Sequence, residues 1–265
     1  MPEGDTVWLA AHRLHEALAG EVLTAADLRV PSLATSDLAG ATVADVTPRG
    51  KHLLMRVVLP DGSPWTLHSH LRMEGSWHLY LPGTRWRGGP GHEIRVILRT
   101  ATRVAVGYRL AELALVPTAA EATLVGHVGP DVLGHDFAPE IARANLLARP
   151  DRVIAEALLD QRVVAGLGMN YVAEACFLTG VQPLATVGQV DAAAVLDVAV
   201  RMLQANRGRA SRVTTGRTAG GASSWVHGRR TCLRCGARVR RSRIGTPPRN
   251  RMIAWCPSCQ PSDRE

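Results

Sequence analysis

The sequence contains no apolar run long enough to cross a membrane, and it does not begin with the charged and apolar segments of a secretory signal peptide. These absences argue against a membrane-embedded or secreted protein. We therefore expect a soluble, cytoplasmic chain with no membrane partner. Its 265 residues are enough for two or three domains, each with its own hydrophobic core.

Lysine is almost absent from this chain. Of the 31 basic side chains, 30 are arginine, and the single lysine is Lys51. Arginine stays charged in proteins, whereas the lysine ammonium is compact and can give up a proton. A lone lysine in such a composition suggests that its position needs an amine, although chance alone also leaves a lysine somewhere.

Acidic residues are nearly absent from the last third of the chain. From residue 201 onward there are 15 arginines and two acidic residues, while the whole chain has a net charge of +8. The C-terminal third is therefore strongly basic and the remainder mildly acidic, which predicts a surface for a polyanion. A disordered basic tail is the alternative, but Trp225, Ile253 and Trp255 lie among the arginines and favour a folded segment.

Only five cysteines are present, and four of them form two closely spaced pairs. Cys232 and Cys235 are followed, after twenty residues, by Cys256 and Cys259. Two such pairs can supply four thiolates in a tetrahedron, which is the pattern of one structural Zn²⁺ ion with no position open to substrate. Disulfides are the weaker alternative in a cytosolic chain. Cys176 remains as an unpaired thiol, which we expect to be buried.

The first five residues, Met-Pro-Glu-Gly-Asp, bring reactive groups together. If Met1 is removed, Pro2 carries a secondary amine with an unperturbed pKa near ~8, which can attack a sugar carbon and form an iminium. A helical pattern follows, and its positive N-terminal pole would favour the neutral, nucleophilic amine. Glu3 is placed to move protons. Alternatively, Pro2 only governs methionine removal and Glu3 is a helix-start carboxylate.

After this helix, residues 1–125 are predicted to be mainly β structure. Several short β-branched and apolar runs separated by turn residues favour a two-layer β-sandwich. The stretch 67–76 is expected to be a polar insert between strands. Within it, Met73 is either core filler or an exposed wedge for a base stack. The expected strands cover residues 43–46, 52–59, 65–68, 93–98 and 103–106.

The second half of the chain has helical patterns. A junction is expected at 127–133, followed by helices over 152–161, 170–178 and about 191–206, the last with Asp191 as N-cap. Glycines at 166 and 168 lie in the turn between the first two helices. Such a turn can direct backbone N–H groups at a phosphate, or it can belong to an ordinary helical hairpin. Residues 207–222 are predicted to be a mobile loop or linker.

Four segments, in order along the chain, resemble the formamidopyrimidine-DNA glycosylase/endonuclease VIII family, and more closely its endonuclease VIII branch. The start resembles that of endonuclease VIII, and the segment containing Lys51 resembles the family's lysine-bearing segment. The helical hairpin resembles the family's helix–two-turns–helix motif, and the cysteine-containing region resembles its zinc finger. The segments are Met-Pro-Glu-Gly-Asp-Thr at 1–6, Arg-Gly-Lys-His-Leu-Leu at 49–54, 158–174, and 226–259 with Arg251 five residues before Cys256.

The resemblance implies an α+β multidomain fold. Residues 1–125 would form an N-terminal catalytic two-layer β-sandwich with a leading helix, residues 126–225 a helix–two-turns–helix DNA-binding domain, and residues 226–265 a zinc-finger hairpin. It implies a base-excision-repair enzyme, a DNA glycosylase with apurinic/apyrimidinic (AP) lyase activity. Its partner would be double-stranded DNA containing damaged bases or abasic sites. The expected form is a monomer that associates with the nucleoid through DNA.

The resemblance also implies roles for individual residues. Pro2 would attack C1′ of the damaged nucleotide and expel the base, with Glu3 as proton donor. Lys51 and Arg251 would hold the phosphates that flank the lesion and assist β- and δ-elimination, since nearby cations stabilise the negative charge that develops there.

Further residues are expected to contact DNA. Met73 would fill the gap left by the flipped nucleotide. Gly168 and Asn170 would contact a phosphate, although Met169 occupies the family's usual asparagine position. His127 stands where an arginine is expected, and Arg249 lies in the zinc hairpin.

Two alternatives remain open at this stage. Residues 3–6 favour oxidised pyrimidines as substrates, whereas the Met73 segment looks more like the branch that acts on oxidised purines such as formamidopyrimidines and 8-oxoguanine. A non-catalytic, zinc-containing nucleic-acid-binding protein would keep the helical motif and the zinc hairpin without the reactive groups.

Overall fold

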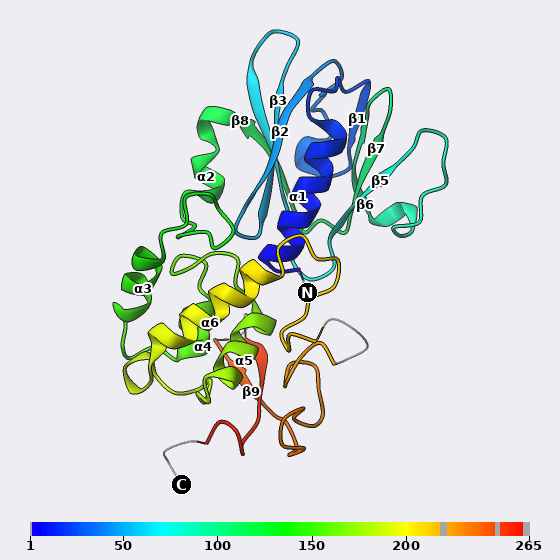
Figure 1. Cartoon of the computed structure of the whole chain (residues 1–265). Coiled ribbons are helices and arrows are strands. Elements are labelled where there is room, and N and C mark those ends of the chain that lie inside the picture. Colours follow the sequence, from blue (N-terminus) through cyan, green and yellow to red (C-terminus); the bar gives the residue numbers. More distant parts are fainter. Residues whose placement is uncertain (1, 218–221, 247–249, 262–265) are drawn as a thin grey trace. The chain divides into compact units, whose positions relative to one another are not determined.

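The computed structural model describes residues 2–217, 222–246 and 250–261 (Figure 1). The chain divides into two compact units, residues 1–127 and 128–265. Strands dominate the first unit and helices the second, so the fold is of the mixed α+β type. The finer boundary predicted between residues 225 and 226 stays a prediction.

The first unit contains helix α1 (Gly4–Leu18) and two four-stranded antiparallel sheets. This arrangement confirms the predicted β-sandwich with a leading helix. One sheet has the order β2-β3-β4-β8, formed by Thr42–Arg49, His52–Val58, Pro64–His70 and Glu112–Pro117. The other has the order β1-β6-β7-β5, formed by Ala25–Leu28, Ile94–Arg99, Val104–Tyr108 and Ser76–Tyr80.

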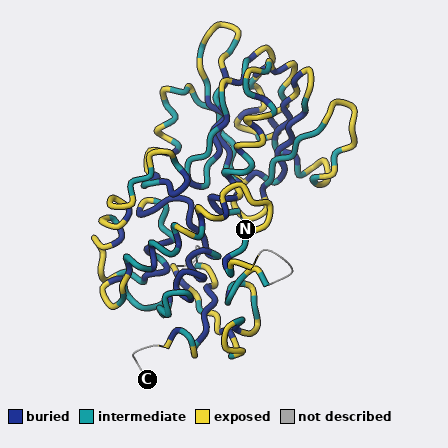
Figure 2. Tube along the Cα trace, viewed as in Figure 1, coloured by how far each residue is buried: buried dark blue, intermediate teal, exposed yellow. Residues whose placement is uncertain are grey.

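Side chains alternate between the two faces of each strand, and the apolar set faces the core. In β3, Leu53, Met55 and Val57 are buried, whereas His52 and Arg56 are only partly buried. The same core includes Leu98 of the second sheet and the apolar stripe of α1. Figure 2 shows these inward positions as buried segments of both sheets. The alternation leaves the outer face of the sheet free for polar groups.

The sequence-based strand assignment was incomplete. The five expected strands are present, but β1, β5 and β8 were not predicted. The expected polar insert at 67–76 was also too long, because β4 continues to His70 and only residues 71–75 form a loop. The reason is that His68 and His70 lie on the outer face of the sheet, where a strand accepts polar side chains.

The direction of α1 relative to β2 determines which end of this unit contains the first residues. The Val46 amide donates to Nδ1 of His15 over 3.2 Å, and the Gly20 amide donates to the Val43 carbonyl over 2.8 Å. The end of α1 therefore lies beside the start of β2, and the two elements run antiparallel. Consequently the first turn of α1 lies at the same end of the unit as the β2–β3 turn (Figure 1).

The second unit contains helices α3 (Pro139–Leu147), α4 (Ile154–Leu159), α5 (Met169–Leu178) and α6 (Ala192–Ala205), whereas the short α2 (Ala122–Val125) belongs to the first. The Asp191 side chain accepts from the Ala194 amide over 2.9 Å, which confirms this residue as the N-cap of α6. Helix α4 is shorter than the predicted 152–161, because Val153 pairs with Thr186 as an isolated β-bridge and cannot join the helix.

The β9–β10 hairpin (Arg240–Ile244 and Arg251–Trp255) shares a hydrophobic core with α5. Phe177 of α5 packs with Val226, Ala254 and Cys256. Near the end of the described chain, the buried Gln260 side chain donates to the Val181 carbonyl over 2.7 Å. The cysteine-containing segment is therefore supported by the helix.

A buried carboxylate holds the long loop after α6. Glu174 of α5 is 0% exposed and accepts four hydrogen bonds. The donors are the Thr214 hydroxyl (2.6 Å) and the backbone amides of Trp225 (2.7 Å), Val226 (2.9 Å) and His227 (2.8 Å). The predicted 207–222 loop is thus fixed to α5 at Thr214, within it, and at residues 225–227, which follow it, while residues 218–221 lie outside the described residues.

We predict that Glu174→Gln destabilises the second unit by on the order of 3 kcal/mol, because an amide group cannot accept all four hydrogen bonds and leaves buried donors unpaired. Chemical denaturation would measure the change. The matched control is Glu140→Gln on the exposed surface of α3, which should change stability by less than about 0.5 kcal/mol. Equal stability of the two variants would show that the Glu174 network contributes little.

Candidate functional site

Pro2 and Glu3 lie at the start of α1. The Glu3 carbonyl accepts from the amides of Thr6 (3.0 Å) and Val7 (3.1 Å), so Glu3 is the residue from which the helix begins. Its side chain is 1% exposed and makes no capping hydrogen bond to the helix. Pro2 is partly exposed. A buried carboxyl group therefore stands next to the residue whose nitrogen would become the chain terminus if Met1 were removed.

Lys51 lies in the two-residue turn between β2 and β3. Arg49 pairs with His52, which leaves only Gly50 and Lys51 in the turn. Gly50 has a φ of +58°, and a positive φ at the first turn position alone is the requirement of a type II′ turn, where glycine is preferred. The glycine thus allows the turn that puts the only lysine at the same end of the unit as the start of α1.

The loop carrying Met73 lies at this end as well, because His70 at the end of β4 pairs with His52. Arg72 adopts a φ of +51°, and its guanidinium forms an ion pair with Glu112 of β8. The Gly75 amide donates to the Leu71 carbonyl over 2.8 Å, and a Cβ at Gly75 would lie 2.5 Å from that carbonyl oxygen. The loop therefore has a defined shape and requires glycine at position 75.

Met73 is 64% exposed at the tip of this loop. It is therefore not core filler, which was one of its two sequence-based interpretations. An exposed, unbranched apolar side chain on a defined loop has the form required to enter a base stack.

A cluster of histidines, not predicted from the sequence, lies behind these groups on the outer face of the sheet. His52, His70 and Glu112 form one row across β3, β4 and β8. Nδ1 of His52 and Nε2 of His68 are 2.8 Å apart, so one ring donates a hydrogen bond to the other. The exposed His127 has its ring 5.9 Å from that of His52. Only two features of the sequence pointed to this cluster. They are the alternation of His68 and His70 along one strand and the position of His52 next to Lys51.

Burial keeps these histidines neutral. It lowers the pKa of His52 to about 3, and the neighbouring His70 and His68 add to the effect. Burial likewise lowers the pKa of His70 to about 4, against the opposing influence of Glu112. The pKa of His68 is also lowered by burial. At neutral pH these three rings therefore add no positive charge to that of Lys51.

In the second unit, Gly168 is the N-cap of α5, and Asn170 is the second residue of the helix. Met169 is 3% exposed and turned inward, whereas Asn170 is partly exposed. The side chain of Gln161 supports the preceding turn. It donates to the carbonyls of Leu159 (3.0 Å) and Leu167 (3.1 Å) and accepts from the Gly166 amide (3.0 Å). The asparagine thus lies in the first turn of a helix whose preceding turn is held by Gln161.

Arg251 is exposed at the beginning of β10. Arg249, the other arginine predicted to contact DNA from this hairpin, lies outside the described residues.

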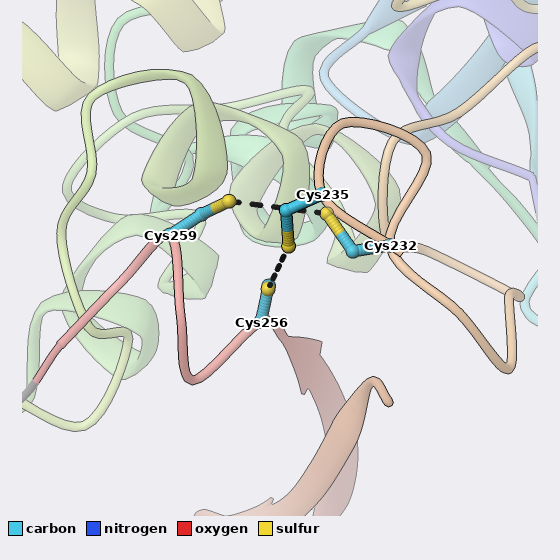
Figure 3. A group of neighbouring side chains, drawn as sticks. All are labelled: Cys232, Cys235, Cys256 and Cys259. Carbon is cyan, nitrogen blue, oxygen red and sulfur yellow. Dashed lines mark hydrogen bonds between the residues drawn. The ribbon is translucent and has the colours of Figure 1, made fainter. Parts of the chain in front are cut away.

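The four predicted cysteine ligands come together (Figure 3). Their sulfur atoms all lie within 4.8 Å of one another, with 4.0 Å between Cys232 and Cys259 and 3.5 Å between Cys235 and Cys256. All four are free thiols, so the disulfide alternative does not apply. A tetrahedron of thiolates about 2.3 Å from a zinc ion has edges of about 3.8 Å, so the donor set fits such an ion. Cys176 is fully buried elsewhere, and burial raises its pKa to about 12.

Two family models match the chain. The formamidopyrimidine-DNA glycosylase N-terminal domain matches residues 1–119, and the formamidopyrimidine-DNA glycosylase H2TH domain matches residues 128–210. A protein of Streptomyces coelicolor named "Probable endonuclease 8 2" is 56% identical over 98% of this chain and 94% of its own length. A protein of Mycolicibacterium smegmatis named "DNA-(apurinic or apyrimidinic site) lyase Nei2" is 45% identical over 98% of this chain and 99% of its own length.

A similar solved structure is that of Lactococcus lactis Fpg in complex with an abasic-site-containing DNA. It covers 98% of this chain and 100% of its own, with a TM-score of 0.80 and 23% identity, and so supports the fold. Within the described ranges, no helix combines the length and apolar character needed to cross a membrane.

We predict that the ring resonances of His52 and His70 do not titrate between pH 7.5 and 5, as followed by NMR. Both pKa values lie below the value of about 6.5 expected in the unfolded chain, so the unfolded state binds more protons. The contribution of these two groups to the free energy of unfolding is therefore fully present above about pH 6.5. It is lost as the pH falls from about 6.5 to about 3. Each group should contribute up to about 1.4 kcal/mol per pH unit. Titration of either ring near pH 6.5 would contradict this assignment.

Proposed function

Because the chain belongs to the formamidopyrimidine-DNA glycosylase/endonuclease VIII family of DNA glycosylase/AP lyases, on its endonuclease VIII branch, we propose that it removes oxidised bases, pyrimidines before purines, through a Schiff base at Pro2. The observation that carries this proposal is the buried carboxyl group of Glu3 directly beside Pro2 at the start of α1. The same end of the unit has the only lysine and the exposed Met73.

In the first step, the Pro2 nitrogen, freed by removal of Met1, attacks C1′ of the damaged nucleotide. The bond from C1′ to the base breaks, the base leaves with the electron pair, and the proton of the attacking nitrogen passes to the departing base. Glu3 donates a proton to the deoxyribose ring oxygen, so that the ring opens to an iminium. The N-terminal pole of α1 favours the neutral amine needed for attack.

The second step is elimination of the two phosphates. Loss of a proton from C2′ of the iminium expels the 3′ phosphate, and a further elimination expels the 5′ phosphate and leaves a gap. Lys51 and Arg251 stabilise the charge that builds up on these leaving groups. Lys51 is suited to this role because the turn after β2 presents it at the end of the unit where Pro2 lies.

The DNA contacts are assigned to the residues predicted from the sequence, of which Met73 and His127 are exposed. Met73 fills the space left by the flipped nucleotide, which costs a few kcal/mol to unstack. Gly168 and Asn170 hold a backbone phosphate at the start of α5, so Asn170 replaces the asparagine that Met169 displaces. His127 and Arg249 contact the backbone of the same duplex. The enzyme acts as a monomer on double-stranded DNA.

The cysteine cluster is assigned to one structural zinc ion. Cys232, Cys235, Cys256 and Cys259 would hold it with no position open to substrate, so the ion supplies stability to the hairpin.

Oxidised purines are the second candidate substrates. The Met73 loop, with Gly75 required by its geometry, is the feature that favours them. The endonuclease 8 names of the Streptomyces and other relatives, together with residues 3–6, support pyrimidines.

We expect borohydride to trap the protein covalently on duplexes containing an abasic site, dihydrouracil or thymine glycol, provided that mass spectrometry shows Pro2 at the N-terminus. Pro2→Gly should remove the adduct while leaving DNA binding intact. Glu3→Gln should reduce base release by about 10²–10⁴-fold.

Glu16→Gln, on the exposed face of α1, is the matched control and should behave as the parent protein. Near-normal base release by Glu3→Gln would show that Glu3 has another role. An absence of adduct from correctly processed protein would favour the non-catalytic DNA-binding alternative. An adduct with 8-oxoguanine in preference to the pyrimidines would reverse the proposed substrate order.

We predict that Cys256→Ser loses bound zinc and at least tenfold in DNA affinity together, because metal binding and folding of the hairpin are coupled. Metal content and fluorescence anisotropy would be measured on the same preparation. Cys176→Ala removes a thiol that is outside the cluster and should keep one zinc ion per chain. Normal DNA binding by a zinc-free Cys256→Ser protein would refute the coupling.

A further inference from the structure

A groove of about 1000 Å³ next to the cysteine hairpin is lined mainly by arginines. The lining includes Arg229, Arg230, Arg238, Arg240 and Arg241. It includes neither Arg251 nor any of the cysteines, so it is separate from the groups assigned above to the lesion and to the metal. The sequence contains no acidic residue between positions 198 and 262, a span with 14 arginines.

Two guanidinium groups of this groove contact neutral partners. Arg240 lies directly opposite Trp255 in the hairpin, with its guanidinium carbon 5.7 Å from the indole centroid. Trp255 in turn donates from Nε1 to the Ser242 hydroxyl over 3.2 Å. Arg229 donates from Nε to the Thr231 carbonyl over 3.2 Å. Among the described residues, none of the five arginines of the groove forms an ion pair with a carboxylate.

Five like charges around one open groove repel each other, and in the described part of the chain no ion pair with a carboxylate offsets that repulsion. An anionic ligand would offset it. Guanidinium forks match the paired oxygens of a phosphodiester. The single indole in the lining is 8% exposed and covered by Arg240, so the groove offers no aromatic surface on which a base could stack. These properties indicate a phosphate backbone as the ligand.

We propose that this groove binds the phosphate backbone of the substrate duplex outside the lesion, a site that extends the contact made by the catalytic groups. The inference rests on the proposed action on duplex DNA. Trp255 lies four residues after Arg251 along β10, which is about 13 Å at about 3.3 Å per residue. With about 3.4 Å per base pair, the groove lies at most roughly four base pairs from the phosphate assigned to Arg251.

The test compares zinc-loaded, full-length protein with the variant Arg230→Gln/Arg238→Gln/Arg241→Gln, which changes three exposed side chains of the groove. The control Arg13→Gln/Arg85→Gln/Arg87→Gln removes the same charge from exposed positions in the first unit. Fluorescence anisotropy measures binding to duplexes that contain an abasic-site analogue and about 3 or about 14 base pairs on each side.

We expect the groove variant to bind the long duplex about 10- to 100-fold more weakly than the parent. The slope of log K against log salt concentration should be smaller in magnitude by about two to three, since each neutralised phosphate contributes about 0.9 to that slope. Binding to the short duplex should change less than about twofold. The control should match the parent on the long duplex. The proposal would be overturned if the variant bound both duplexes equally more weakly, or bound both as tightly as the parent. It would also be overturned if the parent bound a second duplex per protein and the variant did not.

Thermal unfolding at low salt provides a second readout. Relief of repulsion should leave the groove variant at least as stable as the parent, whereas a lower melting temperature would indicate that the arginines are structural and would overturn the proposal. Borohydride trapping on a short duplex that carries a true abasic site, in place of the analogue, separates a failure of the proposed chemistry from a failure of the groove. Failure of the parent to form an adduct counts against the proposed chemistry, while the length dependence of binding still decides the groove.

Discussion

The hydrogen-bond register of the β2-β3-β4-β8 sheet is the constraint on which the first unit depends. Since strand side chains alternate between faces, a slip of one residue would turn His52 and His70 into the core and bring Leu53 to the surface. Burial of Leu53, Met55 and Val57 prevents that slip. The same register brings the Gly50–Lys51 turn and the 71–75 loop to one end of the sandwich, where α1 begins. The placement of the proposed catalytic groups in this unit is thus a consequence of core packing.

The second unit depends on a different kind of interaction. Glu174 lies on α5, the helix that also carries the proposed phosphate ligand Asn170 in its first turn and packs through Phe177 against the cysteine hairpin. By accepting hydrogen bonds from three consecutive backbone amides, its carboxylate fixes the chain just before the first cysteine pair. One buried carboxylate therefore links the helix that bears the proposed phosphate ligand to the segment that precedes the cysteine hairpin.

Much of this organisation could be predicted from sequence, and the reasons are local. A glycine that permits a tight turn, cysteines at fixed spacing and Asp191 at a helix start each act within a few residues. The three strands that escaped prediction, β1, β5 and β8, are all at the edges of their sheets. Edge strands have mixed, half-buried side chains, and their pairing partners decide their conformation. The start of α4 was misplaced for a similar reason, since Val153 forms a bridge with the distant Thr186. The histidine cluster combines three strands and residue 127, so no local pattern reveals it.

The shape of the 71–75 loop is set by its neighbours and not by its most exposed residue. The Arg72–Glu112 ion pair and the tight approach at Gly75 determine the backbone, while Met73 makes no contribution to the core. The backbone conformation of the loop therefore does not depend on which side chain stands at position 73. A side chain of another size or rigidity at position 73 would therefore change the proposed contact with the base stack while leaving the fold of the first unit unchanged.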